Sequence, residues 1–344
     1  MKLNTINFHL TNRCNLLCKH CLYNSGKKLI DELKTPKILK IIKEFAKLSK
    51  NKGTVNLYGG ETLLVKNIFK IIQGAQSENL QIGITTNVNV PDTVLKKLAK
   101  FDVSRITVDI DGGKSSTHDW LRNKKGHFDQ SKKAIQYFLK QGKYVSVNSV
   151  LHKKNANEIE MILNLCKELG INSISFYLFT PLGRGWNIKS QVMCSQEWFA
   201  IKNRVINWVK ENKPQFSVIW EKSYAQKKAE KERRLCDGFE SQVLDVRCDG
   251  KVYFCGLLIS VDGNSFGDLK KEKMENIIKK RKINSFALDT GCSALAIQND
   301  IKTGKSEDMR EKYKNIVPVC PYDWEILSGR KSNMQRKFVH VDDN

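Results

Sequence analysis

The 344-residue sequence contains no long run of apolar residues and no recognisable export signal. A membrane-spanning helix needs about 18 consecutive apolar residues, and no segment approaches that length. Residues 1–30 lack the apolar stretch and cleavage site of a signal peptide, so the ten cysteines are expected to be reduced and free to bind metal. These absences predict a cytoplasmic protein that makes no contact with membranes.

Acidic residues are scarce beside basic ones: 36 Asp and Glu against 59 Lys and Arg give a net charge of +23. The lysines are spread over every predicted helix, and no cluster interleaves arginine with aromatic residues in the way that reads or stacks on bases. Nucleic acid is therefore not an expected partner. Solvated, lysine-rich helix faces are one explanation of the charge, and a surface that attracts an acidic substrate such as an anionic peptide is the other.

Short β-branched segments alternate with amphipathic helical segments over the first two hundred residues, which predicts a parallel α/β fold. The expected strands are 4–10, 54–58, 81–86, 105–110, 144–151 and 173–179. The expected helices are 36–50, 66–76, 92–100, 129–141, 155–169 and 196–210. We therefore predict a partial (β/α)6 barrel. The predicted organisation is the barrel over 1–213, a helical bridge over 214–235, a small α+β domain over 236–327 and a polar tail over 328–344.

Three cysteines, Cys14, Cys18 and Cys21, follow the first predicted strand at the spacing C-x3-C-x2-C. Thiolates are the soft ligands that select iron–sulfur clusters and zinc, but a structural zinc site normally takes four protein ligands. Three thiolates at this spacing fit one four-iron cluster and leave its fourth iron without a protein ligand. A small molecule can occupy that open iron.

Other chemically suited residues also follow predicted strands. Gly59, Gly60 and Glu61 come after the second strand, Asn87 after the third, and Asp109 at the end of the fourth. Chemistry in a barrel of parallel strands is located at the carboxyl ends of those strands. The sequence therefore predicts one active site, shared with the cysteine loop.

With CxxxCxxC after the first strand and GGE after the second, the chain resembles the radical S-adenosylmethionine (SAM) superfamily over roughly residues 4–210. The resemblance implies that Cys14, Cys18 and Cys21 hold a [4Fe-4S] cluster and that SAM chelates its open iron. It also implies a reductant such as flavodoxin or ferredoxin, and a contact between the methionine amino group and the segment of Gly59, Gly60 and Glu61.

The same resemblance implies further SAM contacts. His20 stands where the family usually has an aromatic residue beside the adenine, and Asn87, Asp109 and Asn148 stand where members contact methionine or ribose.

The segment 110–130 looks like the DG…HD..R…G.F stretch of peptide-modifying members. Its His118, Asp119 and Arg122 are expected either to shape the pocket or to cap and pin the following helix. The segment 181–185 (PLGRG) resembles a family loop that lines the SAM or substrate cleft.

A second group of cysteines resembles the opening of a SPASM/twitch domain, which binds auxiliary four-iron clusters. Cys236 and Cys255 enclose a C-x13-G-x4-C pattern with Gly250 in the expected place, but the dense C-x2-C-x5-C-x3-C continuation is lacking. The resemblance implies a truncated, twitch-like domain with an auxiliary [4Fe-4S] cluster on Cys236, Cys255, Cys292 and, as candidate fourth ligand, Cys320. The alternative is four unmetallated core cysteines.

Cys248 and Asp245 lie next to this region and are candidates for substrate chemistry. Cys248 is a candidate hydrogen-atom donor to a substrate radical, and Asp245 a candidate base for a substrate proton. Packing of the thiol and a solvated turn carboxylate are the alternatives. Cys166 is expected in the core.

These implications predict a radical SAM enzyme that reductively cleaves SAM to a 5′-deoxyadenosyl radical and abstracts hydrogen from a peptide. The expected substrate is a short, acidic, ribosomally made precursor that is crosslinked, epimerised or oxidised. Since the chain begins almost at the first strand, any leader sequence is expected to dock on the barrel, the second domain or another protein.

The alternative is a dehydrogenase or rearrangement enzyme of the same superfamily acting on a sugar, cyclitol or cofactor precursor. A non-catalytic electron carrier or RNA-binding protein would need neither an open iron nor GGE.

Overall fold

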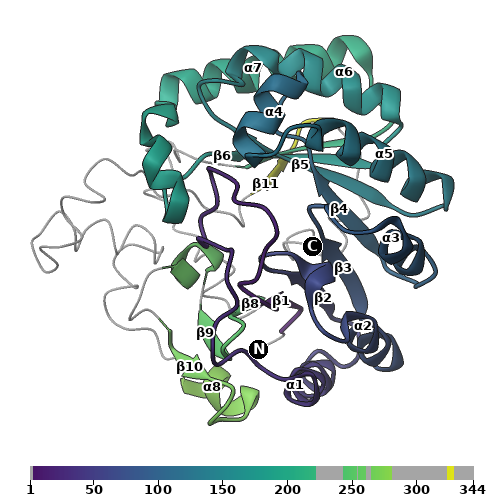
Figure 1. Ribbon diagram of the computed structural model, residues 1–344, viewed down its shortest axis with the longest axis vertical. Helices are drawn as coiled ribbons and strands as arrows, with labels where there is room; N and C mark the ends of the chain where they lie inside the picture. Colours follow the sequence, from purple (N-terminus) through teal and green to yellow (C-terminus); the bar gives the residue numbers. More distant parts are fainter. Residues whose placement is uncertain (1–2, 222–242, 254, 261–264, 281–323, 329–344) are drawn as a thin grey trace, which may run out of the picture.

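The computed structural model describes residues 3–221, 243–253, 255–260, 265–280 and 324–328. Within these residues one eleven-stranded sheet runs in the order β10-β9-β8-β1-β2-β3-β4-β5-β6-β7-β11. The sheet curves, and helices α1 to α7 lie along its outer side (Figure 1). The predicted α/β class with an incomplete barrel is confirmed.

The first six strands begin and end within one residue of the predicted ranges. They are β1 (Thr5–His9), β2 (Thr54–Tyr58), β3 (Gln81–Thr85), β4 (Arg105–Asp109), β5 (Val145–Leu151) and β6 (Ser173–Leu178). All neighbouring pairs among them are parallel.

Apolar and polar side chains alternate along the strands and so point to opposite faces of the sheet. In β4, Ile106 and Val108 are buried in the core beneath the helices, whereas Arg105, Thr107 and Asp109 line a cavity on the inner face. Successive side chains of a strand point to opposite faces of the sheet, so this two-residue period places the polar set inside the barrel.

The helices on the outer side bury their apolar faces against the sheet. They are α1 (Thr35–Leu48), α2 (Ile68–Ser77), α3 (Asp92–Ala99), α4 (Ser115–Arg122), α5 (His127–Lys140), α6 (Ile159–Leu169) and α7 (Ser195–Asn212). The sequence prediction missed α4 as a helix, because its eight residues are mostly polar and offer little apolar periodicity. Short 3-10 segments, η1 (Thr62–Leu64), η2 (Ala156–Glu158), η3 (Gly183–Gln191) and η5 (Gly256–Ser260), complete the connections.

The sheet continues on both sides of the six predicted strands. β7 (Ser217–Glu221) pairs parallel with β6, and β8 (Val243–Val246) pairs parallel with β1. The sheet therefore crosses the predicted boundary at residue 213, although the division into domains stays a prediction. Short antiparallel strands close the edges: β9 (Lys251–Tyr253) and β10 (Gly267–Asp268) beside β8, and β11 (Trp324–Ile326) beside β7.

Helix α8 (Met274–Lys280) packs beside α1, where the Met274 amide donates to the Glu44 carboxylate at 3.2 Å. Among the helices in the described ranges, none combines the length and apolar character that crossing a bilayer requires.

Candidate active site

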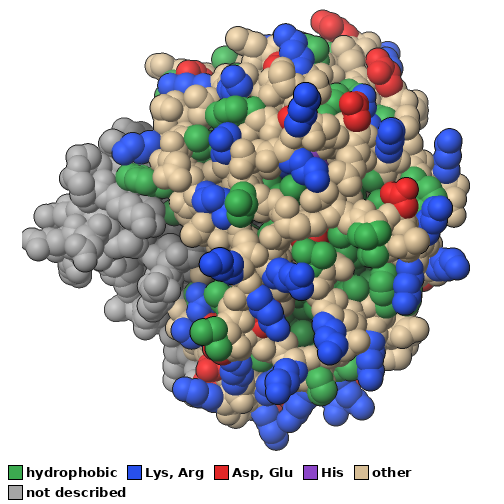
Figure 2. Space-filling view, viewed as in Figure 1, with side chains coloured by type: hydrophobic (Ala, Val, Ile, Leu, Met, Phe, Trp, Pro, Cys, Tyr) green, Lys and Arg blue, Asp and Glu red, His purple; other side chains and the backbone are tan. Residues whose placement is uncertain are grey.

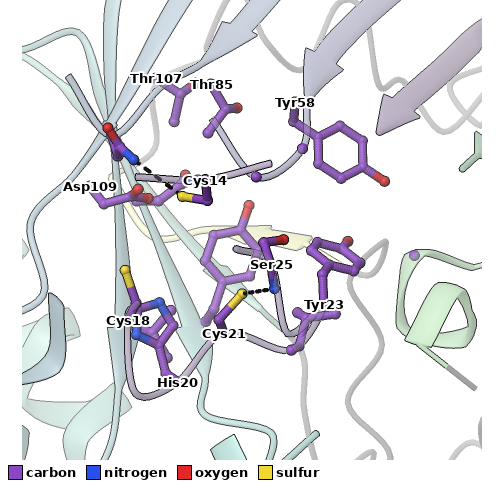
Figure 3. Close-up of a pocket in the computed structure, with 18 of the residues that line it drawn as sticks. Cys14, Cys18, His20, Cys21, Tyr23, Ser25, Tyr58, Thr85, Thr107 and Asp109 are labelled. Carbon is purple, nitrogen blue, oxygen red and sulfur yellow. Dashed lines mark hydrogen bonds between the residues drawn. The ribbon is translucent and has the colours of Figure 1, made fainter. Parts of the chain in front are cut away.

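A cavity of about 390 Å³ opens at the carboxyl ends of the parallel strands, and its wall brings the predicted residues together (Figure 3). The lining includes the predicted residues Cys14, Cys18, His20, Cys21, Gly59, Gly60, Asn87, Asp109, Asn148 and Asp245. The convergence expected from the strand ends is thus present in the structure.

The cysteine loop, which we define as residues 10–26, places three thiols at this cavity. In Figure 3 the sulfurs of Cys14, Cys18 and Cys21 face a common space from one side of it. The loop is closed at its base, because the Cys14 amide donates to the Gly26 carbonyl at 2.9 Å and the Gly26 amide donates to the Asn12 carbonyl at 2.9 Å.

Two side chains from outside the loop fix its path. The Glu32 carboxylate accepts hydrogen bonds from the Thr11 hydroxyl at 2.9 Å and the Asn12 amide at 2.8 Å. Arg184, in the segment after β6, donates from Nε to the Cys18 carbonyl at 3.0 Å and from Nη1 to the Ser25 carbonyl at 2.6 Å. The PLGRG segment therefore clamps the cysteine loop as well as lining the cavity, a role that the sequence did not indicate.

Each of the three sulfurs accepts a hydrogen bond. The Leu16 amide and Asn87 Nδ2 each lie 3.5 Å from Cys14 Sγ, and the Ser25 amide lies 3.4 Å from Cys21 Sγ.

Arg122 Nη1 lies 3.9 Å from Cys18 Sγ. Burial raises the pKa of Cys18 to about 12 and raises the pKa of Cys14, so these thiols become thiolates only with strong positive charge beside them. A metal centre supplies that charge, and the N–H donors stabilise the thiolates that result.

The donor set suits a cluster better than a single ion. Across the described ranges, no three His, Cys, Asp or Glu side chains converge closely enough to hold one metal ion. Ligands of a four-iron cluster bind separate irons, so three thiols spread around a common space fit such a cluster.

Gly59 and Gly60 allow the end of β2 to approach the cysteine loop. A Cβ on Gly60 would lie 2.2 Å from the Arg13 carbonyl oxygen, and one on Gly59 would lie 2.7 Å from the Thr11 oxygen. In the absence of side chains, the Gly60 amide donates to the Thr11 carbonyl at 2.7 Å. These glycines leave the backbone exposed to the cavity, where it can meet a ligand.

Glu61 corrects the expectation that its side chain meets a ligand. The residue is 1% exposed and is not part of the cavity wall. Its carboxylate accepts hydrogen bonds from Leu63 N at 2.8 Å, Thr86 Oγ1 at 2.7 Å and Asn87 N at 2.7 Å. Burial raises the pKa of Glu61 to about 7 against the opposing effect of these donors. Glu61 thus fixes the backbone at Asn87.

A buried arginine holds two carboxylates at the end of β4. Arg122 Nη2 lies 3.0 Å from Asp109 and 2.5 Å from Asp111. Burial raises the pKa of Asp109 despite this cation, whereas for Asp111 the attraction of Arg122 outweighs burial and lowers the pKa. Asp109 lies directly opposite Asn148 on β5, so these two polar groups form adjacent wall positions.

Asp119 belongs to a cap, one of the two roles expected for it. Its carboxylate accepts from the Gly126 amide at 2.6 Å and the Phe128 amide at 2.8 Å, at the start of α5. His20 lines the cavity, and burial lowers its pKa to about 3.

A chain of polar side chains crosses the inner face below the thiols. Asp245 on β8 accepts from Asn7 Nδ2 at 3.2 Å and from the Tyr58 hydroxyl at 3.4 Å. Asn7 Oδ1 accepts from Asn56 Nδ2 at 2.9 Å, and Asn56 Oδ1 accepts from Arg105 at 2.9 Å. The sequence offered a signal for Asn56 and Arg105, since both occupy inward positions of the two-residue alternation.

Asp245 differs from the expectation of a solvated turn carboxylate, since it is 1% exposed within a strand. The register that pairs Asn7 with Asp245 carries it into the first cavity.

Cys248 lies outside the wall of the first cavity, and its candidate role as a hydrogen-atom donor stays a prediction. It is buried and lines a second cavity of about 310 Å³, together with His9, Tyr23 and Arg247, and it does not line the first. Burial raises the pKa of the Cys248 thiol to about 12.

Some of the other cysteines lie within the described residues and some lie outside them. Cys255 is buried in a small cluster with Tyr253 and Ile259. Cys166 is a core residue, as predicted. The predicted ligands Cys236, Cys292 and Cys320 lie outside the described residues.

An incomplete α/β barrel with three cysteine thiols at the carboxyl end of its strands has the architecture of an iron–sulfur enzyme. The radical SAM superfamily model matches residues 8–166, and the model of the iron–sulfur cluster-binding SPASM domain matches residues 236–299. The chain belongs to the radical SAM superfamily and carries a SPASM-type domain. Its cofactors are accordingly SAM and [4Fe-4S] clusters.

Characterised relatives act on different substrates. The chain is 28% identical over 300 residues to the AdoMet-dependent heme synthase of Methanosarcina barkeri, covering 81% of this chain and 84% of that protein. It is 28% identical over 226 residues to a GTP 3′,8-cyclase of Clostridium botulinum, covering 64% and 70%. It spans only 51% of the heme synthase of Oleidesulfovibrio alaskensis.

Two solved structures share the fold. Streptococcus suis SuiB bound to S-adenosylmethionine superposes with a TM-score of 0.67 at 15% identity, over 80% of this chain and 65% of SuiB. Native anSMEcpe with bound AdoMet and Cp18Cys peptide gives a TM-score of 0.63 at 15% identity, over 86% of this chain and 87% of that one. This chain thus spans slightly less than two thirds of SuiB.

Proposed function

We propose that Cys14, Cys18 and Cys21 hold the SAM-binding [4Fe-4S] cluster and that the first cavity is the active site of a peptide-modifying radical SAM enzyme. When bound, the cluster and SAM supply a 5′-deoxyadenosyl radical that abstracts hydrogen from the substrate. The observation that carries the proposal is the convergence of three hydrogen-bonded thiols with the ends of five parallel strands at one cavity.

The chain's own residues bind and orient SAM in this proposal. The exposed backbone at Gly59 and Gly60 and the amide of Asn87 offer polar groups to the methionine end. Asp109 and Asn148 form an adjacent polar pair suited to ribose hydroxyls. His20, kept neutral by burial, offers a flat ring to the adenine.

Asp245 is proposed to hold or accept a substrate proton. It lies in the cavity wall with the Tyr58 hydroxyl 3.4 Å from its Oδ1, and it belongs to the polar chain that ends at Arg105. The buried charge of that carboxylate and the neighbouring hydroxyl make a proton-transfer pair within reach of a bound side chain.

Surface charge supports a peptide substrate. Figure 2 shows Lys and Arg side chains spread over this face, with few Asp and Glu among them. With a net charge of +23, such a surface attracts an acidic precursor peptide.

A small-molecule substrate is the second candidate. It is favoured by the curated relatives, which are named for heme synthesis and GTP cyclisation and are more similar in sequence than SuiB and anSMEcpe, the two proteins that have been solved with a bound peptide. Arg105 and Arg184 in the cavity wall provide cationic partners for the carboxylates or phosphates of such a molecule.

The experiment is hydrogen transfer into 5′-deoxyadenosine by anaerobically reconstituted enzyme supplied with SAM and dithionite. The probes are an Asp/Glu-rich peptide library deuterated at carbon, deuterated GTP and a deuterated metalloporphyrin. Deuterium from the peptides alone supports the peptide proposal. Deuterium from GTP or the porphyrin alone replaces it with the second candidate.

The Cys18→Ala variant is the control for the cofactor assignment. It is expected to release no 5′-deoxyadenosine, whereas Cys166→Ala, which removes a buried thiol far from the cavity, is expected to release it normally. Equal release by both variants would contradict the ligand assignment.

A further inference from the structure

Two buried imidazoles join the ends of β4 and β3 behind the cysteine loop. His118 is on α4 and His127 begins α5; they are 0% and 1% exposed. His118 Nε2 lies 2.9 Å from His127 Nδ1, and the two rings are within 8° of parallel. His118 Nδ1 is 3.0 Å from the Asp111 amide, and His127 Nε2 is 2.8 Å from the Asn87 carbonyl oxygen.

The partners at the two ends determine where the protons are. A backbone amide can only donate, so His118 Nδ1 must be the acceptor for Asp111 N–H. A carbonyl can only accept, so His127 Nε2 must carry the proton donated to Asn87. The central contact then requires His118 Nε2–H donating to His127 Nδ1, which also lies 3.5 Å from the Ser131 hydroxyl.

Both rings are therefore neutral, with one proton each on Nε2. Burial lowers the pKa of His118 to about 3 and that of His127 to about 4, in agreement with this assignment. The pair forms one directional chain of hydrogen bonds from Asp111 N–H to the Asn87 carbonyl.

Each end of this chain of hydrogen bonds is a backbone group of a residue whose side chain leads, directly or through Arg122, to a cysteine sulfur. The Asn87 side chain donates to Cys14 Sγ at 3.5 Å. The Asp111 carboxylate pairs with Arg122 at 2.5 Å, and Arg122 Nη1 is 3.9 Å from Cys18 Sγ. The imidazoles thus bond the backbone of Asn87, whose side chain donates to Cys14, and the backbone of Asp111, whose carboxylate holds Arg122 beside Cys18.

We propose that the His118–His127 pair is a positioning device that holds Asn87 and the Asp111–Arg122 ion pair against the cysteine sulfurs and so raises the reduction potential of the cluster bound there. This inference rests on the proposed function. Hydrogen bonds to the sulfurs are among the features that set the potential of an iron–sulfur cluster, and N–H donors stabilise its more negative, reduced form. Residues that orient the ligands of a metal centre often affect its properties nearly as much as the ligands themselves do.

The test is an EPR-monitored redox titration of the reconstituted holoenzyme in the absence of substrate. The EPR signal that changes when SAM is added is assigned to the cluster on the cysteine loop. His127→Phe keeps a ring of similar size but breaks the chain. It is expected to lower the equilibrium constant for reduction by about tenfold, which is about 59 mV for a one-electron couple.

Two comparison variants make the result specific. His127→Gln retains a donor toward Asn87 and is expected to restore most of the wild-type potential. His152→Phe removes a buried imidazole whose Nδ1 accepts from the Lys154 amide at 3.2 Å and which bonds neither Asn87 nor Asp111 among the described residues, and it is expected to leave the potential unchanged.

A double-mutant cycle covers the case in which His127→Phe retains little iron. Asn87→Ala alone should lower the potential, and adding His118→Phe should lower it by less than His118→Phe does in the wild type, because the two changes share the contact at Cys14 while His118 also acts through Asp111. Additive shifts would overturn the inference, as would an unchanged potential in His127→Phe at full iron content. If the wild type holds no cluster that responds to SAM, the proposed function fails instead.

Discussion

The two segments that carry cysteines differ in how many contacts from the described residues fix them in place. The cysteine loop is fixed by Glu32, Arg184 and the backbone of Gly60, and all three of its sulfurs receive donors. The segment 248–260 is fixed by the Leu33 amide on the Cys248 carbonyl at 2.7 Å and by the Arg247–Asp249 pair. Among the residues described, it contributes Cys248 and Cys255 only.

This difference shows which part of the fold supplies the residues of each site. The three thiols of the first site and the donors to their sulfurs all come from residues 14–122, although Asp245 on β8 also lines the first cavity. Cys248 and Cys255 depend for any further cysteine ligand on Cys236, Cys292 or Cys320, which fall outside the described residues. Mutations that break these supports should therefore have large effects at the first site and small effects at the second.

The largest effect is expected from Arg122→Leu. It leaves Asp109 and Asp111 buried without their cation and is expected to cost about 3–5 kcal/mol of unfolding free energy. Urea denaturation of the anaerobic protein measures it. The matched change at the second segment, Arg247→Leu, leaves a single buried carboxylate, that of Asp249, which still accepts from the Lys251 amide, and should cost less, about 1–3 kcal/mol. Equal costs would contradict the contrast.

The next effect concerns pH. The pKa values of His118 and His127 lie near 3 and 4 in the folded protein but near 6.5 when unfolded, so the unfolded chain binds more protons between pH 4 and pH 6.5. Stability conferred by neutral imidazoles is therefore present above pH 6.5 and lost as pH falls. From pH 7 to pH 5 each ring should cost about 2 kcal/mol.

A His118→Phe/His127→Phe variant checks this prediction. Its stability should fall less steeply between pH 7 and pH 5 than that of the wild type, in parallel urea titrations. If the two slopes coincide, the two imidazoles do not titrate as the folded geometry requires.

A smaller effect is expected from Gly183→Ala in the clamp segment. Gly183 has φ +55°, and a Cβ there would lie 2.5 Å from the Leu22 carbonyl oxygen and 2.6 Å from the Cys21 oxygen. Strain and the displaced loop should cost about 3 kcal/mol and reduce iron content. Gly142→Ala is the control, because Gly142 has φ +69° with nothing within 4 Å of its Cβ position, and about 1 kcal/mol is expected.

The smallest effect is expected from Cys248→Ala. Since Cys248 lines the second cavity, its loss should leave 5′-deoxyadenosine release unchanged and cost about 1 kcal/mol in stability. Release measured by chromatography decides the point. A large fall in release would return Cys248 to the first active site.

The sequence predicted most of the fold because local patterns determine it. Strands β1 to β6 were located by short β-branched segments between amphipathic helical ones, and the cysteine loop by its spacing. The pairing of β8 with β1 was not predictable, because Asn7 and Asp245 are 238 positions apart and the register depends on how the barrel edge is filled. The sequence therefore indicated Asp245 as a candidate base, with a solvated turn carboxylate as the alternative, but not its neighbours in the sheet.

The candidate site shows the same limit. Residue types and strand ends indicated Asn87 and Asp109 at the cavity, and both are there. The burial of the Glu61 side chain and the place of Cys248 at the second cavity could not be predicted, because the direction in which a loop residue points depends on packing beyond its own segment. The Arg184 clamp joins residues more than 150 positions apart and left no local pattern.

The most direct test of the account is iron per chain after anaerobic reconstitution, in the wild type and in a Cys14/Cys18/Cys21→Ala variant. If these three cysteines hold one four-iron cluster, the variant should lose about four irons per chain and all release of 5′-deoxyadenosine. About eight irons falling to about four would also establish an auxiliary cluster, whereas four falling to none would confine iron to the cysteine loop. Iron content that is unchanged in the triple variant would contradict the central claim.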